Sequence, residues 1–328
     1  MDQLPGPPPA PILGNIHQVN PGYKVHIRFT EWADQYGSMY RMKLMNRNSI
    51  VVTGLAEIKE VLITKGKDFG GRSGRFRISY MTDNRSDMMS LDYGPDNVYR
   101  RKLLHSHLKQ YGEGINRIED ATRTIVDEMI ENLIQRNGEA LDVEESLQHA
   151  IIDLTYVLLL GEIQQDQEDR EAIMTVVQHM VDVLSVSGPG LWLDIFPWLR
   201  FFGHSSYKKL VEMRSIVRKF TNKWRAKAEG MECNENIIHK LLNIVNGENP
   251  YNLNDRNVEQ LTWQLFIGAT STTVATLATM MNALAQNPNI QEKLYHEIME
   301  KVGPNAHISF KDREKLPYCY ATVLEATR

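Results

Sequence analysis

Hydroxyl-bearing side chains gather in one uncharged stretch of the sequence, where their chemistry needs an explanation. The run Gly268-Ala269-Thr270-Ser271-Thr272-Thr273 places two small residues directly before four hydroxyls. In a helix, a threonine or serine hydroxyl can donate to the carbonyl one turn earlier and loosen the backbone ladder there. The run therefore indicates either a helix that packs closely through small residues or a helix that presents alcohols to a bound group.

A carboxylate and a guanidinium form a second candidate near the C-terminus. Glu325 and Arg328 are three residues apart, so they share one face of a helix and can pair. A partly buried, bidentate arginine–carboxylate contact is strong and demands a fixed geometry. Glu-x-x-Arg also occurs by chance on many solvated helices, so its meaning depends on the surrounding sequence.

Histidines and cysteines give no metal site. His105 and His107 are two residues apart, and on a helix they point to different faces. Cys233 and Cys319 are far apart and lack CxxC spacing, which disfavours both a structural zinc site and a disulfide-stapled secreted domain. The chain is therefore expected in a reducing compartment, with no metal-ligating side-chain set of its own.

Length and composition define the kind of scaffold that must position these residues. With about 150 residues per domain, the 328 residues correspond to roughly two units. The 42% hydrophobic and 24% charged residues are enough to bury a core, which excludes a disordered chain. Acids exceed bases by 41 to 37, so the charge gives no reason to expect a nucleic-acid partner.

Apolar periodicity predicts a mainly α fold with a small N-terminal β portion. Residues 1–15 form a proline-rich arm that cannot be helical, because proline fixes φ and removes amide donors. Residues 38–53 predict a hairpin that turns at 46–48. Residues 16–328 show no further domain boundary. Helices are expected at 26–36, 55–65, 115–135, 147–158, 173–184, 210–224, 235–245, 258–286, 290–302 and 320–328.

One of these helices is long enough to be tested as a membrane span. No charge occurs between Glu259 and Glu292. The stretch nevertheless holds many threonines, Gln264, Asn282 and Gln286, and a lipid-facing span would rarely carry so many polar groups. A helix buried inside a large protein is the better interpretation.

Four features, in the same order along the chain, resemble the pattern of microsomal cytochromes P-450. The resemblance covers essentially the whole chain and implies a cytochrome P-450-like fold whose C-terminal third is missing. The four features are the proline-rich arm before Gly14-Asn15, Asp92-Tyr93-Gly94-Pro95 before Arg101-Lys102-Leu103, the hydroxyl run before Asn287-Pro288, and Leu316-Pro317-Tyr318 before Glu325-Ala326-Thr327-Arg328.

This resemblance implies that the hydroxyl run faces a haem b group. In that family small residues let oxygen approach the helix backbone, and an acid–alcohol pair relays protons on the open side of the haem. Gly268, Ala269 and Thr273 are then expected to line the cofactor, and Thr272 to supply the alcohol. Ser271 stands where the acid is expected, and serine can hold a water but carries no charge near neutral pH.

Two further haem-binding positions follow from the same resemblance. Arg101 aligns with the arginine that the family directs at a haem propionate, which is a charge-assisted contact. Asn97 stands where the family has tryptophan; it can donate one hydrogen bond but loses the aromatic packing. The alternative for Arg100-Arg101-Lys102 is an exposed basic run on a solvated face. Glu325 and Arg328 are expected to form the family's structural pair beneath the haem.

The family's axial ligand is a cysteine in a glycine- and phenylalanine-rich loop well after the Glu-x-x-Arg helix. Cys319 precedes that helix and Cys233 has no such loop, so the axial cysteine is expected to be absent from this chain. Since the thiolate favours O–O cleavage, this chain is not expected to perform that chemistry by itself. A partial gene model or a trimmed fragment would account for both the missing ligand and the missing anchor.

The activity implied by the resemblance is a haem-thiolate monooxygenase. It would insert one oxygen atom into a small apolar, steroid- or xenobiotic-like substrate, using electrons from a flavoprotein reductase at the cytoplasmic face of the endoplasmic reticulum membrane. Because Ser271 is uncharged, a haem-thiolate isomerase that rearranges peroxides is a second hypothesis. The third is a haem-free, non-catalytic remnant. A coding sequence that continues beyond Arg328 into a cysteine loop would favour an enzyme.

Overall fold

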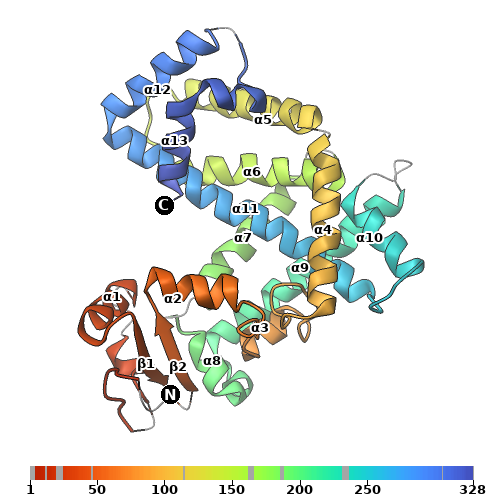
Figure 1. Ribbon diagram of the computed structural model, residues 1–328. Helices are drawn as coiled ribbons and strands as arrows, with labels where there is room; N and C mark the ends of the chain where they lie inside the picture. The colour runs from red at the N-terminus through yellow and green to blue at the C-terminus, as the bar shows by residue number, and fades with distance from the viewer. Residues whose placement is uncertain are drawn as a thin grey trace. The chain divides into compact units, whose positions relative to one another are not determined.

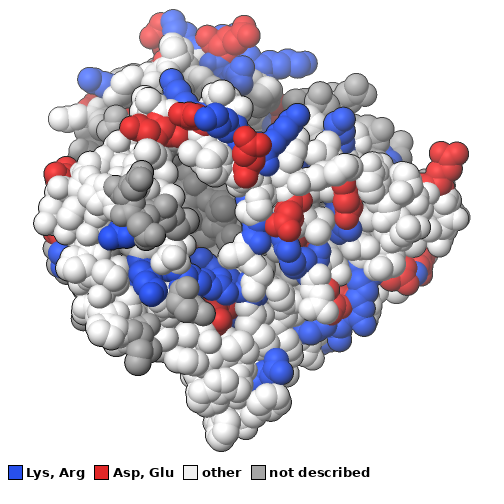
Figure 2. All heavy atoms as spheres, turned by 60° about the horizontal axis from the view of Figure 1, so that its bottom comes forward, with Lys and Arg blue, Asp and Glu red and all other residues white. Residues whose placement is uncertain are grey.

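The computed structural model describes residues 4–11, 13–19, 25–45, 47–113, 115–161, 166–184, 188–230, 236–304 and 306–327, without the side chains of 107–117 and 181. It divides into two compact units, residues 1–100 with 178–215 and residues 101–177 with 216–328 (Figure 1). The fold is mainly α with one small sheet near the N-terminus, as predicted. On the face shown in Figure 2, charged residues of both signs are interspersed.

Asn15 ties the proline-rich arm to the sheet of the first unit. Its buried side-chain amide donates to the carbonyls of Pro7 (3.3 Å) and Pro8 (3.1 Å), and its Oδ1 accepts from Lys43 N (2.7 Å). Gly14 adopts a φ of 62°, and a Cβ there would lie 2.2 Å from the Lys43 carbonyl oxygen. Only glycine therefore allows the arm to approach the strand this closely.

The sheet is an antiparallel hairpin of β1 (Met39–Leu44) and β2 (Arg47–Val52), with Met39 opposite Val52. Alternation places Tyr40 and Met42 in the core, where they pack on Trp32 of α1 (Val25–Tyr36). The Tyr40 hydroxyl donates to Phe29 O (3.0 Å), and burial raises the pKa of Tyr40 to about 12. The predicted hairpin is confirmed.

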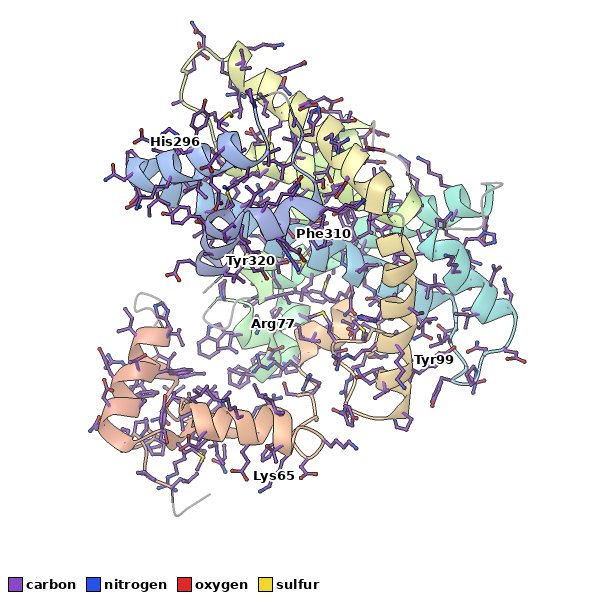
Figure 3. All side chains as sticks on the ribbon, turned by 45° about the horizontal axis from the view of Figure 1, so that its top comes forward. Lys65, Arg77, Tyr99, His296, Phe310 and Tyr320 are labelled. Atoms are coloured by element: carbon purple, nitrogen blue, oxygen red, sulfur yellow. The ribbon has the colours of Figure 1, made fainter. Side chains whose placement is uncertain are left out.

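A buried ion pair links two short helices of the first unit, α3 (Phe76–Met81) and α8 (Leu191–Ile195). Arg77 donates to the Asp194 carboxylate from its backbone N (2.9 Å), Nε (3.0 Å) and Nη2 (2.8 Å), and from Nη1 to the Val183 carbonyl. The side chains of Arg77 and Asp194 are 2% and 4% exposed. Figure 3 labels Arg77 among the side chains around it.

The other short elements of the first unit are η1 (Ile16–Gln18), α2 (Leu55–Lys59), η2 (Glu60–Thr64) and η3 (Pro197–Phe202).

Long helices build the second unit, and three of them run through a boundary between the units. The crossing helices are α4 (Pro95–Glu113), α7 (Gln167–Leu184) and α9 (Ser205–Gly230). The others are α5 (Ile115–Gln135), α6 (Val143–Leu160), α10 (Ile237–Asn246), α11 (Asp255–Gln286), α12 (Pro288–Lys301), the short η4 (Phe310–Lys315) and α13 (Pro317–Ala326).

The first half of α11 is the buried helix that the uncharged stretch predicted. It starts with a capping box in which Asn254 accepts from Asn257 N (3.2 Å) and Asn257 Oδ1 accepts from Asn254 N (2.9 Å). It packs along α6, where Leu147 and Ile151 contact Val274. Among the helices of the described residues, none combines the length and the hydropathy of a membrane span.

Four aromatic rings fill the core where α6, α9 and α11 meet. Trp224 Nε1 donates to the Tyr156 hydroxyl (2.9 Å), and both side chains are buried. Phe266 stacks edge-on against Tyr156 with 5.7 Å between ring centroids, and Trp263 lies parallel to Trp224 at 6.2 Å. Burial raises the pKa of Tyr156, so its hydroxyl stays neutral and available to the indole.

Candidate functional site

Asn97 and Arg100 lie on the first turns of α4 and point inward. Asn97 Nδ2 donates to the Met88 carbonyl (2.7 Å). Arg100 donates to Asp96 from Nε (2.7 Å) and Nη2 (2.8 Å), and from Nη1 to the Ser86 carbonyl (2.6 Å). The side chains of Asn97 and Arg100 are both buried. These contacts fix the loop before α4 rather than reaching outward.

Arg101, by contrast, is exposed, and its side chain has no ion pair or hydrogen bond with the residues the structure describes. The basic run is therefore divided: Arg100 is a buried structural residue, whereas Arg101 is exposed. Arg100 was not among the residues predicted to have a role of their own. Arg100 follows Asp96 by four residues, so the two side chains are neighbours on a helix. This spacing was the signal in the sequence that could have identified Arg100 as a structural residue.

The hydroxyl run adopts the backbone bonding that its composition predicts. Thr272 Oγ1 donates to the Gly268 carbonyl (2.7 Å), and Ser271 Oγ donates to the Ile267 carbonyl (2.8 Å). Gly268, Thr272 and Thr273 are exposed, whereas Ala269 and Ser271 are half-buried. A Cβ added at Gly268 would meet nothing within 4 Å among the described atoms. This face of α11 is thus open to a bound group.

Thr270 belongs to the packing face of the same run. Its buried hydroxyl lies 3.3 Å from that of Thr155 on α6. Thr270 also donates to Phe266 O (2.9 Å) and Thr155 to Ile151 O (2.7 Å), and each hydroxyl has a single hydrogen. The two interpretations of the run therefore apply to different residues: Thr270 serves close packing, and Thr272 faces outward.

Three cavities that are lined by described residues have volumes of about 400, 280 and 450 Å³, and neither Arg101 nor Thr272 lines any of these three. The described residues provide an exposed guanidinium, an open glycine position and an alcohol one turn after it. In chemical type, the guanidinium suits a carboxylate such as a propionate, and the open glycine position leaves room beside α11.

The structure describes only some of the remaining candidate residues. Glu325 is exposed on α13, and Arg328 lies outside the described residues, so their pairing stays a prediction. Within the described residues no cluster of histidine, cysteine and acidic side chains could hold a metal ion. His105 is exposed; the side chain of His107 lies outside the described residues.

Cys319 is held as a neutral thiol at the start of α13. Glu297 of α12 accepts from the backbone amides of Tyr318 (2.9 Å) and Cys319 (2.8 Å). Burial, with the Glu297 carboxylate beside it, raises the pKa of the Cys319 thiol to about 11. A metal-binding cysteine must be a thiolate, so this environment disfavours Cys319 as an iron ligand. Cys233 lies outside the described residues.

Comparisons with known proteins identify the family to which the chain is similar. A family model for cytochrome P450 matches residues 4–328. The chain is 27% identical to a steroid 17-alpha-hydroxylase/17,20 lyase of Ictalurus punctatus and 28% identical to a cytochrome P450 1A1 of Oryzias latipes, over 99% of this chain in each case. It spans about 65% of the length of each of these relatives.

A solved structure supports the fold independently of sequence. It is a zebra fish cytochrome P450 with progesterone, which superposes with a TM-score of 0.79 at 23% identity. The match covers 93% of this chain and 70% of that one. Because the family model spans nearly every residue and the helices superpose on a solved member, the chain belongs to the cytochrome P450 family.

Proposed function

We propose that the protein is a haem-thiolate monooxygenase that inserts one oxygen atom into a small apolar, steroid- or xenobiotic-like molecule, with electrons from a flavoprotein reductase. The observation that carries this proposal is the outward face of α11, where the Thr272 hydroxyl is bonded to the Gly268 carbonyl beside open space. The relatives named as a steroid hydroxylase and as cytochrome P450 1A1 support the substrate class.

Each residue then has a distinct task toward the haem. The exposed guanidinium of Arg101 binds a propionate, Asn97 holds the preceding loop through Met88, and Gly268 and Ala269 let the macrocycle approach α11. When bound, the haem supplies oxygen activation through its thiolate ligand. We expect that ligand to be a cysteine other than Cys319, whose thiol is protonated at neutral pH.

Proton delivery is the task of the two alcohols. Thr272 and Ser271 both donate their single hydrogen to α11 carbonyls, so their lone pairs face the site and can accept from water. Either hydroxyl must rotate away from its carbonyl before it can donate a proton outward. Thr273, the next residue along α11, is exposed as well.

The test measures coupling, the fraction of consumed oxygen that appears as product, in the haem-loaded protein with reductase. Thr272→Ala removes the outward alcohol and should lower coupling by at least about tenfold, since a general-acid group contributes about 10²–10⁴-fold to a rate. The matched control is Thr279→Ala, which removes a hydroxyl with the same backbone bond two turns further along α11. Equal coupling in the two variants would refute the assignment of Thr272.

Ser271 supports a second candidate function, the rearrangement of peroxides without a reductant. Its hydroxyl bonds to Ile267 O, and no carboxylate stands at this position. If the protein is a monooxygenase, Ser271→Asp should improve coupling because it introduces an acid at this position. Unchanged or lower coupling would count against assigning this position to the proton relay. Reductant-free isomerisation of an organic peroxide tests the second function directly.

We further propose that the protein works on the cytoplasmic face of the endoplasmic reticulum membrane. The aromatic surface, defined as Trp192, Trp198, Phe201 and Phe202 of the first unit, supports this. Phe201 and Phe202 are 73% and 78% exposed, and tryptophan is typical of the membrane–water interface. Replacing both phenylalanines by serine should reduce co-sedimentation with phosphatidylcholine–phosphatidylserine vesicles. Equal sedimentation would contradict this surface assignment.

A further inference from the structure

A short exposed segment of the first unit presents a serine between two arginines. Residues 70–75, with the sequence GGRSGR, form neither helix nor strand, and residues 71–74 are all exposed. The segment is fixed at both ends. Gly70 O accepts from Tyr93 N (2.9 Å), and α3 begins directly after residue 75. The fold therefore holds Ser73 at the tip of an irregular loop, where modification and cleavage sites are most often found.

The Ser73 hydroxyl is accessible and not engaged by the fold. Its Oγ makes no hydrogen bond with the part of the chain that the structure describes. A Cβ added at Gly74 would meet nothing within 4 Å, so open space lies beside the serine. Thr124 of α5 is also exposed, but its hydroxyl donates to Asp120 O (3.1 Å) within a helix. Ser73 thus combines an unbonded hydroxyl with a backbone that an enzyme can bind in an extended form.

The charges on either side of Ser73 are mainly positive. Residues 66–76 contain three bases, Lys67, Arg72 and Arg75, and one acid, Asp68, which gives a net charge of +2. Arg75 has no ion pair or side-chain hydrogen bond among the described residues. An acidic protein surface would therefore be attracted to this segment, and a basic one would be repelled.

A carboxylate from a neighbouring loop contacts the segment without changing this balance. Asp92 Oδ1 accepts from Arg72 N (2.5 Å) and from Arg85 Nη2 (2.8 Å). Since Arg85 forms an ion pair with Asp92, adding both residues to the count leaves the net charge at +2. The Arg72 guanidinium is exposed and its printed contact is a long one, from Nη1 to the carbonyl of the preceding Gly71 (3.4 Å).

We propose that Ser73 is a phosphorylation site for a serine/threonine protein kinase whose substrate cleft is acidic. The kinase would recognise Arg72, directly before the serine, and Arg75, two residues after it. Ser73 Oγ attacks the γ-phosphorus of ATP, so an O–P bond forms, the bond from that phosphorus to the β,γ-bridging oxygen breaks, and ADP leaves. The hydroxyl proton passes to a carboxylate of the kinase. Because a phosphoserine carries a charge of about −2 at pH 7, the modification would neutralise the segment and give Arg75 an anionic partner.

Incubation of the folded full chain with ATP and protein kinase C, a kinase that recognises basic residues, tests the proposal. Mass spectrometry of the digested product should place the phosphate on Ser73, and Ser73→Ala should abolish that phosphopeptide. Arg75→Gln should lower kcat/KM for phosphorylation about tenfold, the effect of losing one charge-assisted contact with the kinase. Neither substitution should lower the melting temperature, since neither side chain has a partner among the described residues.

The matched controls are Arg123→Gln and Thr124→Ala, because Arg123 directly precedes an exposed hydroxyl that is part of α5. Both variants should be phosphorylated at Ser73 like the unchanged chain. The proposal is overturned by an absence of phosphate on Ser73, by equally fast phosphorylation of Thr124, or by an undiminished rate in Arg75→Gln. Because none of these readouts involves haem, their failure would leave the proposed oxygenase function untouched.

Discussion

Removing the charge of Asp194 should strongly destabilise the first unit, because it breaks a buried ion pair rather than an exposed one. Asp194→Asn keeps the shape of the side chain, but its amide turns donors toward Arg77, which already donates three hydrogen bonds to the carboxylate. Both groups are nearly fully buried, and breaking such a pair costs about 3–5 kcal/mol. That loss corresponds to a fall in melting temperature of roughly 10 °C.

Thermal and urea unfolding followed by circular dichroism measure this effect. Asp120→Asn is the matched control, since Asp120 pairs with Arg123 at 3.1 Å but is 72% exposed; it should cost less than about 1 kcal/mol. The double variant Arg77→Met with Asp194→Leu should recover more than half of the loss, because it leaves no unpaired charge. If Asp194→Asn and Asp120→Asn unfold alike, the ion pair is not what holds α3 to α8.

Three further outcomes follow from the contacts of the second unit. Tyr156→Phe leaves the buried Trp224 indole N–H without its partner and should lower the free energy of unfolding by about 1–3 kcal/mol. Denaturant titrations measure this loss, and an unchanged unfolding midpoint would count against the hydrogen bond. Burial opposes ionisation of Glu297, but the backbone amides at the start of α13 hold the pKa of its carboxyl below 4.5. The contribution of the ionised Glu297 to the stability of the fold should therefore be present above pH 4.5 and be lost as the pH falls further. In Glu297→Gln this pH dependence of the melting temperature should be absent. Cys319 should react with iodoacetamide at pH 8 far more slowly than a free cysteine, and faster in Glu297→Gln; rapid alkylation of the unchanged chain would contradict the raised thiol pKa.

The sequence patterns predicted elements well where one physical signal dominated. The hairpin was predicted at 38–53 from a rough alternation and found as β1 and β2, where Tyr40 and Met42 are the buried residues of β1 and favour one register. The uncharged helix was predicted from Val258 and begins at Asp255. The three additional residues belong to the capping box of Asn254 and Asn257, a polar signal outside the apolar pattern.

Other elements carried too weak a periodic signal. The helix α4 was not among the predicted helices, since its apolar residues do not recur on one face and its stability depends on contacts such as that of Arg100 with Asp96. The division into two units also leaves no linker in the sequence, because α4, α7 and α9 run through the boundaries. A boundary inside a helix has no composition change to reveal it.

The candidate site was predictable by residue type but not by role. The hydroxyl run was visible in the sequence, yet the separation of Thr270 from Thr272 depends on which face of α11 meets α6, and that is fixed by packing of Leu147 and Ile151 on Val274. The same holds for the basic run. Arg100 is buried because it donates to loop carbonyls such as that of Ser86, whereas Arg101 is exposed, and these loop contacts cannot be read from the run itself.

A structure of the haem-loaded protein tests the central claim most directly. It should show the Arg101 guanidinium within hydrogen-bonding distance of a haem propionate, and the open face between Gly268 and Thr272 directly over the macrocycle. A haem bound elsewhere, with Arg101 still in solvent and Thr272 turned away from it, would contradict the proposed haem site.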